Sequence, residues 1–175
     1  SYLGKIILHQ PNYLFNYSNI GYQTYLVSPE SVEMMNRLYF DIYRLGQVRD
    51  KIEEAEPIIR QADMLSFDIT AIKHSDAPAN PKASPNGFYA EEACQMMRYA
   101  GMNDKLSSIG IYEINPEYDT QGKTSHLAAQ MIWCFLDGFY NRKNDFPNRN
   151  DQDYVRFHVV LQDDKYEINF YKSKK

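Results

Sequence analysis

The chain has 175 residues, of which 24% are charged and 43% hydrophobic, and its formal net charge is −4 at pH 7. This length fits one domain with a substantial core, and the composition is ordinary for a globular protein. The sequence has no basic stripe of the kind that nucleic-acid-binding proteins carry, and no apolar run as long as a transmembrane helix. The composition therefore argues against a nucleic-acid partner and against a membrane partner.

The N-terminal quarter of the chain predicts two short strands and one long helix. The strand candidates are residues 5–8 and residues 22–27, the second because it is rich in β-branched and aromatic residues. A helix start follows at residues 28–30, where a serine can cap free amides and a glutamate lies in the first turn. Apolar residues recur at helical spacing from there to Leu45, and Gly46 is a natural stop.

The middle of the chain predicts an alternation of helices and strands. Residues 50–62 have a weaker helical pattern, and a helix there is expected to start near Pro57 because the residue before a proline disfavours the helical conformation. The nearly continuous apolar run at residues 64–69 predicts a short buried strand. Three further elements follow: a helix at residues 88–100, a strand at residues 107–114 and a long, deeply packed helix at residues 124–140. This alternation predicts the α/β class, with a parallel sheet and crossover helices.

After Pro147 the pattern changes to one typical of antiparallel strands. Residues 155–161 and residues 166–171 both alternate between apolar and polar side chains, with a polar turn between them. We predict a β-hairpin that is an accessory or an interface element. The chain is accordingly divided into an α/β domain at residues 1–147 and the hairpin at residues 148–175.

One carboxylate interrupts the buried strand near its C-terminal end. Burying Asp68 there is costly unless it is hydrogen-bonded, paired or bound to a metal. Ligands of α/β sheets bind at the carboxyl ends of strands. The loop that follows, residues 71–87, has no helical or strand period, and such long loops are usually functional or disordered. Asp68 is therefore the leading candidate for chemistry, and a surface loop with a capped aspartate at its root is the alternative.

Four motifs, in this order and setting, resemble the ureohydrolase family, which comprises the arginases, agmatinases and formimidoylglutamases. They are residues 66–68 (Ser-Phe-Asp) closing a strand, 84–88 (Ser-Pro-Asn-Gly-Phe) ending a proline-rich loop, 111–116 (Ile-Tyr-Glu-Ile-Asn-Pro) closing the next strand, and 124–129 (Thr-Ser-His-Leu-Ala-Ala) opening a helix. The resemblance spans residues 21–142 and is greatest to the divergent branch of Bacteroidetes-type bacteria. It implies the C-terminal portion of an arginase-like three-layer α/β/α fold.

The resemblance also implies a reaction and roles for particular residues. Members of the family use two Mn²⁺ ions to turn water into hydroxide, which attacks a guanidinium or formimino carbon. Asp68 matches a metal ligand of the family, and Glu113 matches the glutamate that binds the cationic end of the substrate. Thr70 stands where the family has a second metal-binding aspartate. Asp76 and His74, in the loop, are weaker candidates for metal ligands.

The family's Asp-x-His-x-Asp motif is absent, since none of the four histidines has an aspartate two residues away on each side. Chains of the family are usually considerably longer, and the resemblance places the missing ligands in their N-terminal half. We therefore expect this chain to be the C-terminal part of a larger metal-dependent hydrolase of linear amidines, to be inactive alone, and to contain no catalytic residue that can be assigned with confidence.

Two other functions remain open. Thr70 favours a ureohydrolase-like protein that has lost catalysis and serves as a binding or assembly subunit. The 15 tyrosines and nine phenylalanines favour an independent α/β domain that binds another protein, although a dense core explains them too. The resemblance implies a homo-oligomer acting on arginine, agmatine or formimidoylglutamate. The cysteines Cys94 and Cys134 lie in helical patterns, which suggests unpaired thiols in the cytoplasm.

Overall fold

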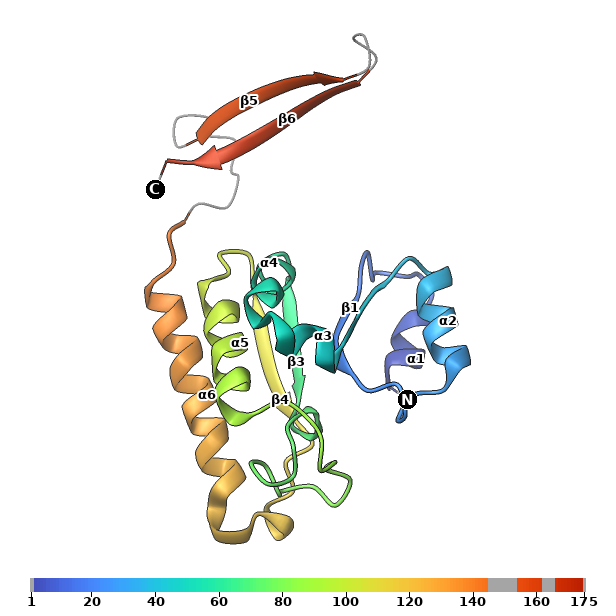
Figure 1. Cartoon of the computed structure of the whole chain (residues 1–175), viewed down its shortest axis with the longest axis vertical. Helices are drawn as coiled ribbons and strands as arrows, with labels where there is room; N and C mark the ends of the chain where they lie inside the picture. Colours follow the sequence, from blue (N-terminus) through green and yellow to red (C-terminus); the bar gives the residue numbers. More distant parts are fainter. Residues whose placement is uncertain (1, 145–153, 162–165, 175) are drawn as a thin grey trace.

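A computed structural model of the chain describes residues 2–144, 154–161 and 166–174 (Figure 1). Its helices are α1 (Tyr2–Ile7), α2 (Pro29–Arg37), α3 (Leu45–Asp50), α4 (Ala55–Arg60), α5 (Ala90–Met102) and α6 (Lys123–Tyr140). Its strands are β1 (Ser18–Tyr22), β2 (Asp41–Arg44), β3 (Met64–Asp68), β4 (Ser108–Tyr112), β5 (Tyr154–Leu161) and β6 (Tyr166–Ser173). Among these residues no helix combines the length and the apolar character that crossing a bilayer requires.

The strands form three separate pairs. β1 pairs with β2 and β3 pairs with β4, both in parallel, whereas β5 and β6 form an antiparallel hairpin. Helix α2 lies in the connection from β1 to β2, and α5 lies in the connection from β3 to β4. The α/β class, the parallel strands with crossover helices and the C-terminal hairpin are therefore confirmed. The predicted division between residues 147 and 148 lies outside the described residues.

Three elements near the N-terminus were predicted wrongly. Residues 5–8 belong mainly to α1, and no described strand pairs with them. The strand predicted at residues 22–27 instead ends at Tyr22, and turns follow it. The long helix stops at Arg37, and the left-handed backbone of Tyr39 (φ 56°) separates it from β2. Pairing with β1 makes residues 41–44 a strand even though their apolar spacing also fits a helix.

The helix predicted near Pro57 begins two residues earlier than expected. Helix α4 starts at Ala55, so Pro57 lies in its first turn, where a missing N–H costs no intrahelical hydrogen bond. A short 3₁₀ turn, Ile52–Glu54, separates α4 from α3. The proline therefore fits inside the helix.

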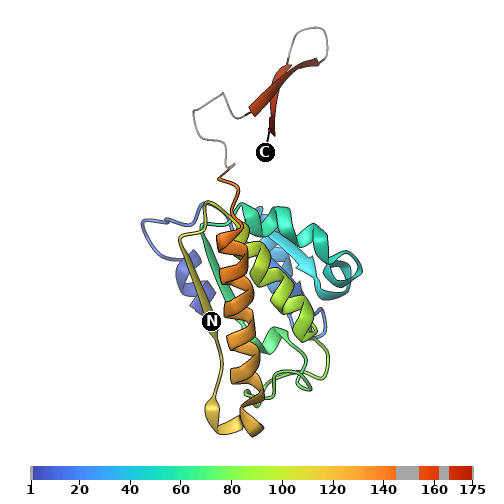
Figure 2. The ribbon, with the colours of Figure 1, turned by 90° about the vertical axis from the view of Figure 1, so that its left-hand side faces the viewer.

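The core lies between the β3–β4 pair and the helices α5 and α6, which run side by side (Figures 1 and 2). The predicted buried stripe of α5 is confirmed, and its members are Ala93, Met96, Met97 and Ala100. Helix α6 buries Leu127 and Met131, but Ile132 and Leu136 are nearly half exposed. The expectation that the whole apolar face of α6 is deeply packed is therefore wrong, because α5 covers only part of that face.

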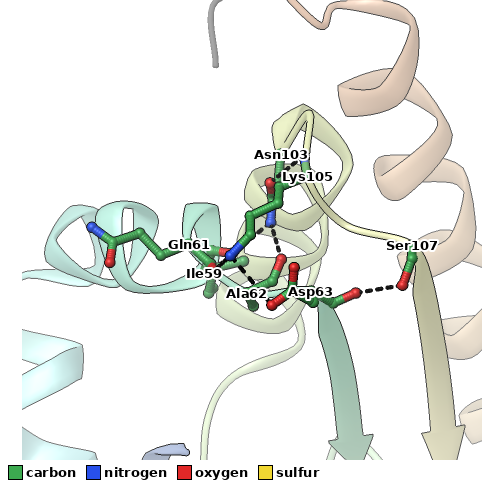
Figure 3. A network of polar contacts seen from close by, with 7 residues as sticks. All are labelled: Ile59, Gln61, Ala62, Asp63, Asn103, Lys105 and Ser107. Carbon is green, nitrogen blue, oxygen red and sulfur yellow. Dashed lines mark hydrogen bonds and ion pairs between the residues drawn. The ribbon is translucent and has the colours of Figure 1, made fainter. Parts of the chain in front are cut away.

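A network of polar contacts holds the amino-terminal ends of β3 and β4 together (Figure 3). The Asn103 side chain is fully buried, and its Nδ2 donates to the carbonyls of Ile59 and Ala62 at 2.9 and 2.7 Å. Below it, the amide and the hydroxyl of Ser107 both donate to the Asp63 carbonyl. These hydrogen bonds therefore hold the segments that lead into β3 and β4 next to each other.

Two glycines let α5 and α6 approach at backbone distance. A Cβ atom on Gly101 would overlap the Phe135 carbonyl oxygen and lie 2.8 Å from the Phe139 amide nitrogen. A Cβ on Gly138 would likewise overlap the Arg98 carbonyl oxygen. The obstructing atoms belong to the backbone, so a side chain at either position would push the helices apart.

We predict that Gly101→Ala destabilises the protein by about 3 kcal/mol, as overpacking of a rigid interface does. Gly46→Ala is the matched control, because a Cβ there meets nothing within 4 Å and Gly46 lies in α3. We expect Gly46→Ala to stabilise the protein by about 0.5–1 kcal/mol, since alanine suits a helix better than glycine. Urea unfolding of both variants measures the two effects. Equal shifts in the same direction would contradict the proposed helix contact.

Candidate functional site

The carboxyl ends of β3 and β4 meet at one edge of the sheet. Asp68 ends β3 and is paired in register with Tyr112, the last residue of β4. Glu113 is the next residue after Tyr112. The two residues that the sequence singles out are therefore placed at the same edge, where ligands of parallel sheets bind.

Asp68 is half-buried and accepts two hydrogen bonds from Thr70. Its Oδ1 accepts the Thr70 amide at 2.9 Å and the Thr70 hydroxyl at 2.6 Å. These contacts begin the 3₁₀ turn Ile69–Ala71, in the manner of an aspartate that caps a turn. The capped aspartate at the root of the loop, which the sequence offered as an alternative, is thus present. Both hydrogen bonds use Oδ1, so this cap does not prevent Asp68 Oδ2 from binding a metal.

Glu113 has a left-handed backbone, with φ 67°, which costs a residue other than glycine about 1–2 kcal/mol. The side chain of Asn80 holds it there. This side chain is only 5% exposed, and its Nδ2 donates to the Glu113 carbonyl at 2.8 Å and to Glu113 Oε2 at 3.3 Å. Strained backbone maintained by its surroundings is common at functional sites. Asn80 therefore fixes both the backbone and the carboxylate of Glu113.

Glu113 lines an open cavity of about 280 Å³. The residues around the cavity are Asn80, Pro81, Lys82, Glu113, Ile114 and Asn115. A carboxylate in such a setting accepts paired hydrogen bonds from a planar cation. Asp68 is not part of this lining, so the two candidates lie at one sheet edge but contribute different surfaces.

The loop at residues 71–87 is packed and connects distant parts of the fold. Ile72 forms a bridge to Phe88, and a Cβ on Gly87 would lie 2.5 Å from the Lys73 amide nitrogen. Only glycine allows this close approach of two backbone segments. The Phe88 ring in turn packs against Gly21 of β1, where a Cβ would overlap the ring. The loop thereby joins the β1–β2 pair to the site.

The two weaker metal candidates in the loop have other surroundings. His74 has an exposed side chain, and its amide donates to the Ser84 carbonyl at 2.7 Å. Asp76 accepts the amide of Ala90, the first residue of α5, at 3.1 Å and lies 3.6 Å from the Lys73 ammonium. Asp76 thus stabilises the amino-terminal end of a helix, a setting that suits a negative charge.

Sequence reasoning missed the residues that support the site. Thr124 is fully buried, and its hydroxyl accepts the Ala79 amide at 3.0 Å, next to Asn80. Asp119 accepts the Ser125 hydroxyl and the amides of Thr124 and Ser125 at the start of α6. These contacts, the Ser125 hydroxyl above all, lower the pKa of Asp119 to about 2. An aspartate shortly before a predicted helix is a signal for such a cap, but nothing local identifies Asn80.

The described residues do not form a manganese centre on their own. Among them no group of three or more histidine, cysteine, aspartate and glutamate side chains gathers in a way that could hold a metal. Mn²⁺ requires several carboxylate or imidazole ligands. Asp68 supplies one carboxylate, and the hydroxyl of Thr70 is turned toward that carboxylate as a donor. A complete centre would need ligands from beyond these residues.

The chain is similar in sequence to curated formimidoylglutamases. That of Staphylococcus haemolyticus is 36% identical over 91 residues, which cover 51% of this chain and 28% of the relative. That of Photorhabdus laumondii is 26% identical over 134 residues, which cover 73% and 42%. This chain therefore spans less than half the length of these relatives.

Solved structures of a formiminoglutamase and of an arginase share the fold. A crystal structure of Trypanosoma cruzi formiminoglutamase (oxidized) with Mn²⁺ matches with a TM-score of 0.66 at 23% identity, over 71% of this chain and 45% of that one. The native arginase of Bacillus caldovelox matches with a TM-score of 0.61 at 20% identity, over 68% and 42%. These likenesses confirm an arginase-like fold over that part of the chain.

A family model also matches most of the chain. It is that of the arginase family, and it covers residues 7–137, which include β1 to β4 and most of α6 but not the hairpin. The resemblance inferred from the four motifs is thus confirmed at the level of the family, whereas the Bacteroidetes-type branch stays a prediction. The chain belongs to the arginase family.

Proposed function

We propose that the protein containing this chain hydrolyses a C–N bond of a linear amidine, of the formimidoylglutamate or arginine type, in the cytoplasm. The position of Glu113 carries this proposal. Asn80 holds Glu113 in the wall of an open cavity, at the carboxyl edge of the sheet. Membership of the arginase family supports the reaction class, and the formimidoylglutamase relatives favour the formimino substrate. The two unpaired cysteines suit a reducing compartment.

In this proposal Glu113 binds the cationic end of the substrate. Its carboxylate accepts hydrogen bonds from the amidinium N–H groups, which orients the C–N bond. Lys82 lines the same cavity and gives it a positive charge that suits a substrate carrying a carboxylate. Asp68 contributes one carboxylate to a manganese site. The other ligands come from parts of the protein outside this chain, so the chain alone is inactive.

We predict that the natural gene product contains two Mn²⁺ ions per chain and releases formamide or urea from a linear amidine. Asp68→Ala should remove bound manganese and activity together, because one carboxylate ligand is lost. Asp76→Asn is the matched control and should keep the metal, since Asp76 caps α5. Elemental analysis and product assays measure both. Unchanged manganese content in the Asp68→Ala variant would show that Asp68 is not a manganese ligand.

We predict that Glu113→Gly stabilises the protein by about 1 kcal/mol, because glycine adopts the left-handed conformation without strain. The same variant should lose binding of the amidine cation. Glu113→Ala is the control: it should lose binding without the gain in stability. Thermal unfolding and calorimetric titration with arginine or formimidoylglutamate give the two readouts. Full binding by the Glu113→Gly variant would refute the role of Glu113.

A second candidate function is a family member that has lost catalysis and serves as a binding or assembly subunit. The 2.6 Å hydrogen bond from the Thr70 hydroxyl to Asp68 favours it, because a donor takes the place of a second carboxylate ligand. Such a protein keeps the fold and gives up part of its metal site. In that case the natural gene product would hold fewer than two Mn²⁺ ions.

Thr70→Asp tests this second candidate. Without metal, two adjacent carboxylates repel each other, so we expect the variant to unfold at a lower temperature in the presence of a chelator. Added Mn²⁺ should reverse the loss and raise the bound metal by one ion per chain. Thr70→Val is the control, since it removes the hydroxyl without adding charge. If Thr70→Asp binds no additional metal, a degraded metal site is the wrong explanation.

A further inference from the structure

The C-terminal hairpin has two unlike faces. Residues directly opposite in an antiparallel pair share a face, and successive residues alternate between faces. One face, called here the apolar hairpin face, consists of four cross-strand pairs: Val155 with Lys172, Phe157 with Phe170, Val159 with Ile168, and Leu161 with Tyr166. The other face includes Arg156, Glu167 and Tyr171, and a 3.0 Å hydrogen bond joins His158 Nδ1 to Asn169 Oδ1 across it.

The apolar hairpin face has no partner among the described residues. Strands β5 and β6 pair with each other and make no more than isolated contacts with any other described helix or strand (Figure 1). Phe157, Phe170 and Tyr166 are 50%, 55% and 60% exposed. A hairpin of two strands is marginally stable at best in water. This face therefore needs to be covered by something else.

We propose that the apolar hairpin face is the interface with a second copy of this chain, stacked face to face about a two-fold axis. The exposed parts of its apolar side chains amount to roughly 600 Å² per copy, or about 1,200 Å² for the pair, which reaches the lower limit for specific interfaces. A two-fold arrangement needs only one self-complementary patch. The hairpin also lies outside the residues matched by the family model.

The order of residues along this face is self-complementary. Lys172 is the one charged residue on the apolar hairpin face, and it lies at the opposite end from Tyr166. The two-fold axis lies between the two stacked faces and runs across the strands at their middle. It brings Lys172 over Tyr166 of the second copy, which allows a cation–π contact at each end. In the centre, the Phe157–Phe170 row then lies over the β-branched side chains of the second copy, as favourable sheet packing requires. The opposite face, which carries Arg156, His158, Asn169 and Glu167 beside Val160 and Tyr171, stays in water.

Sedimentation equilibrium of the natural gene product tests this proposal. Phe170→Glu places a charge in the centre of the interface, and we expect it to raise the dimer dissociation constant at least about 30-fold, as loss of a buried aromatic anchor does. Tyr171→Glu is the matched control: Tyr171 is the next residue, is 47% exposed and lies on the opposite face. We expect its dissociation constant to stay within about threefold of the natural protein's, as at rim positions.

Other results overturn the proposal. A natural protein that stays monomeric at high concentration excludes a second copy as the occupant and leaves another part of the protein to cover the face. An oligomer that survives Phe170→Glu but dissociates with Trp133→Glu assigns the interface to the exposed face of α6, where Trp133 is 67% exposed. Phe170→Leu is the control for misfolding, and we expect it to keep both the dimer and the melting temperature of the natural protein. Loss of the dimer in the Phe170→Leu or Tyr171→Glu variant would also contradict the proposed face.

Discussion

One buried amide decides where the two central strands begin. Asn103 ends α5, and its fully buried side chain donates to two carbonyls that precede β3. The Ile59 carbonyl also accepts the Ala62 amide, so Asn103 adds a second hydrogen bond there and supplies one to the Ala62 carbonyl. Strands β3 and β4 start together at this point (Figure 3). Because they run in parallel and in register, Asp68 and Glu113 reach the same edge. The position of the site therefore follows from a contact at the opposite end of the sheet.

The site itself depends on how the long loop is packed. Thr124 holds Ala79, and Asn80 beside it holds Glu113 in a left-handed conformation that its backbone would not adopt alone. The carboxylate is thus positioned by buried polar groups from another segment. At Asp68 on the same edge, the Thr70 hydroxyl donates a 2.6 Å hydrogen bond to the carboxylate. A shared fold carries its chemistry only where these side chains allow it.

The cavity and the hairpin are on separate elements, so the proposed reaction and the proposed assembly depend on different parts of the chain. The cavity belongs to the part of the chain that the family model matches, whereas β5 and β6 lie outside that match. The proposed binding of an amidine needs a positioned charge, whereas the proposed contact between two hairpins needs apolar area. Changes in one are therefore expected to leave the other intact, as holds for distant sites without shared contacts.

The sequence alone determined the features that depend on short-range patterns: the buried stripe of α5, the alternation of the hairpin strands and the four family motifs. Tertiary structure decided the rest. Residues 41–44 fit a helix by spacing but form β2, because β1 offers them a partner. Asn80 contacts Glu113 across 33 residues and Thr124 contacts Ala79 across 45, and no local propensity encodes such pairs. Whether an apolar residue of α6 is buried likewise depends on which neighbour covers it, because burial is a property of the packed fold.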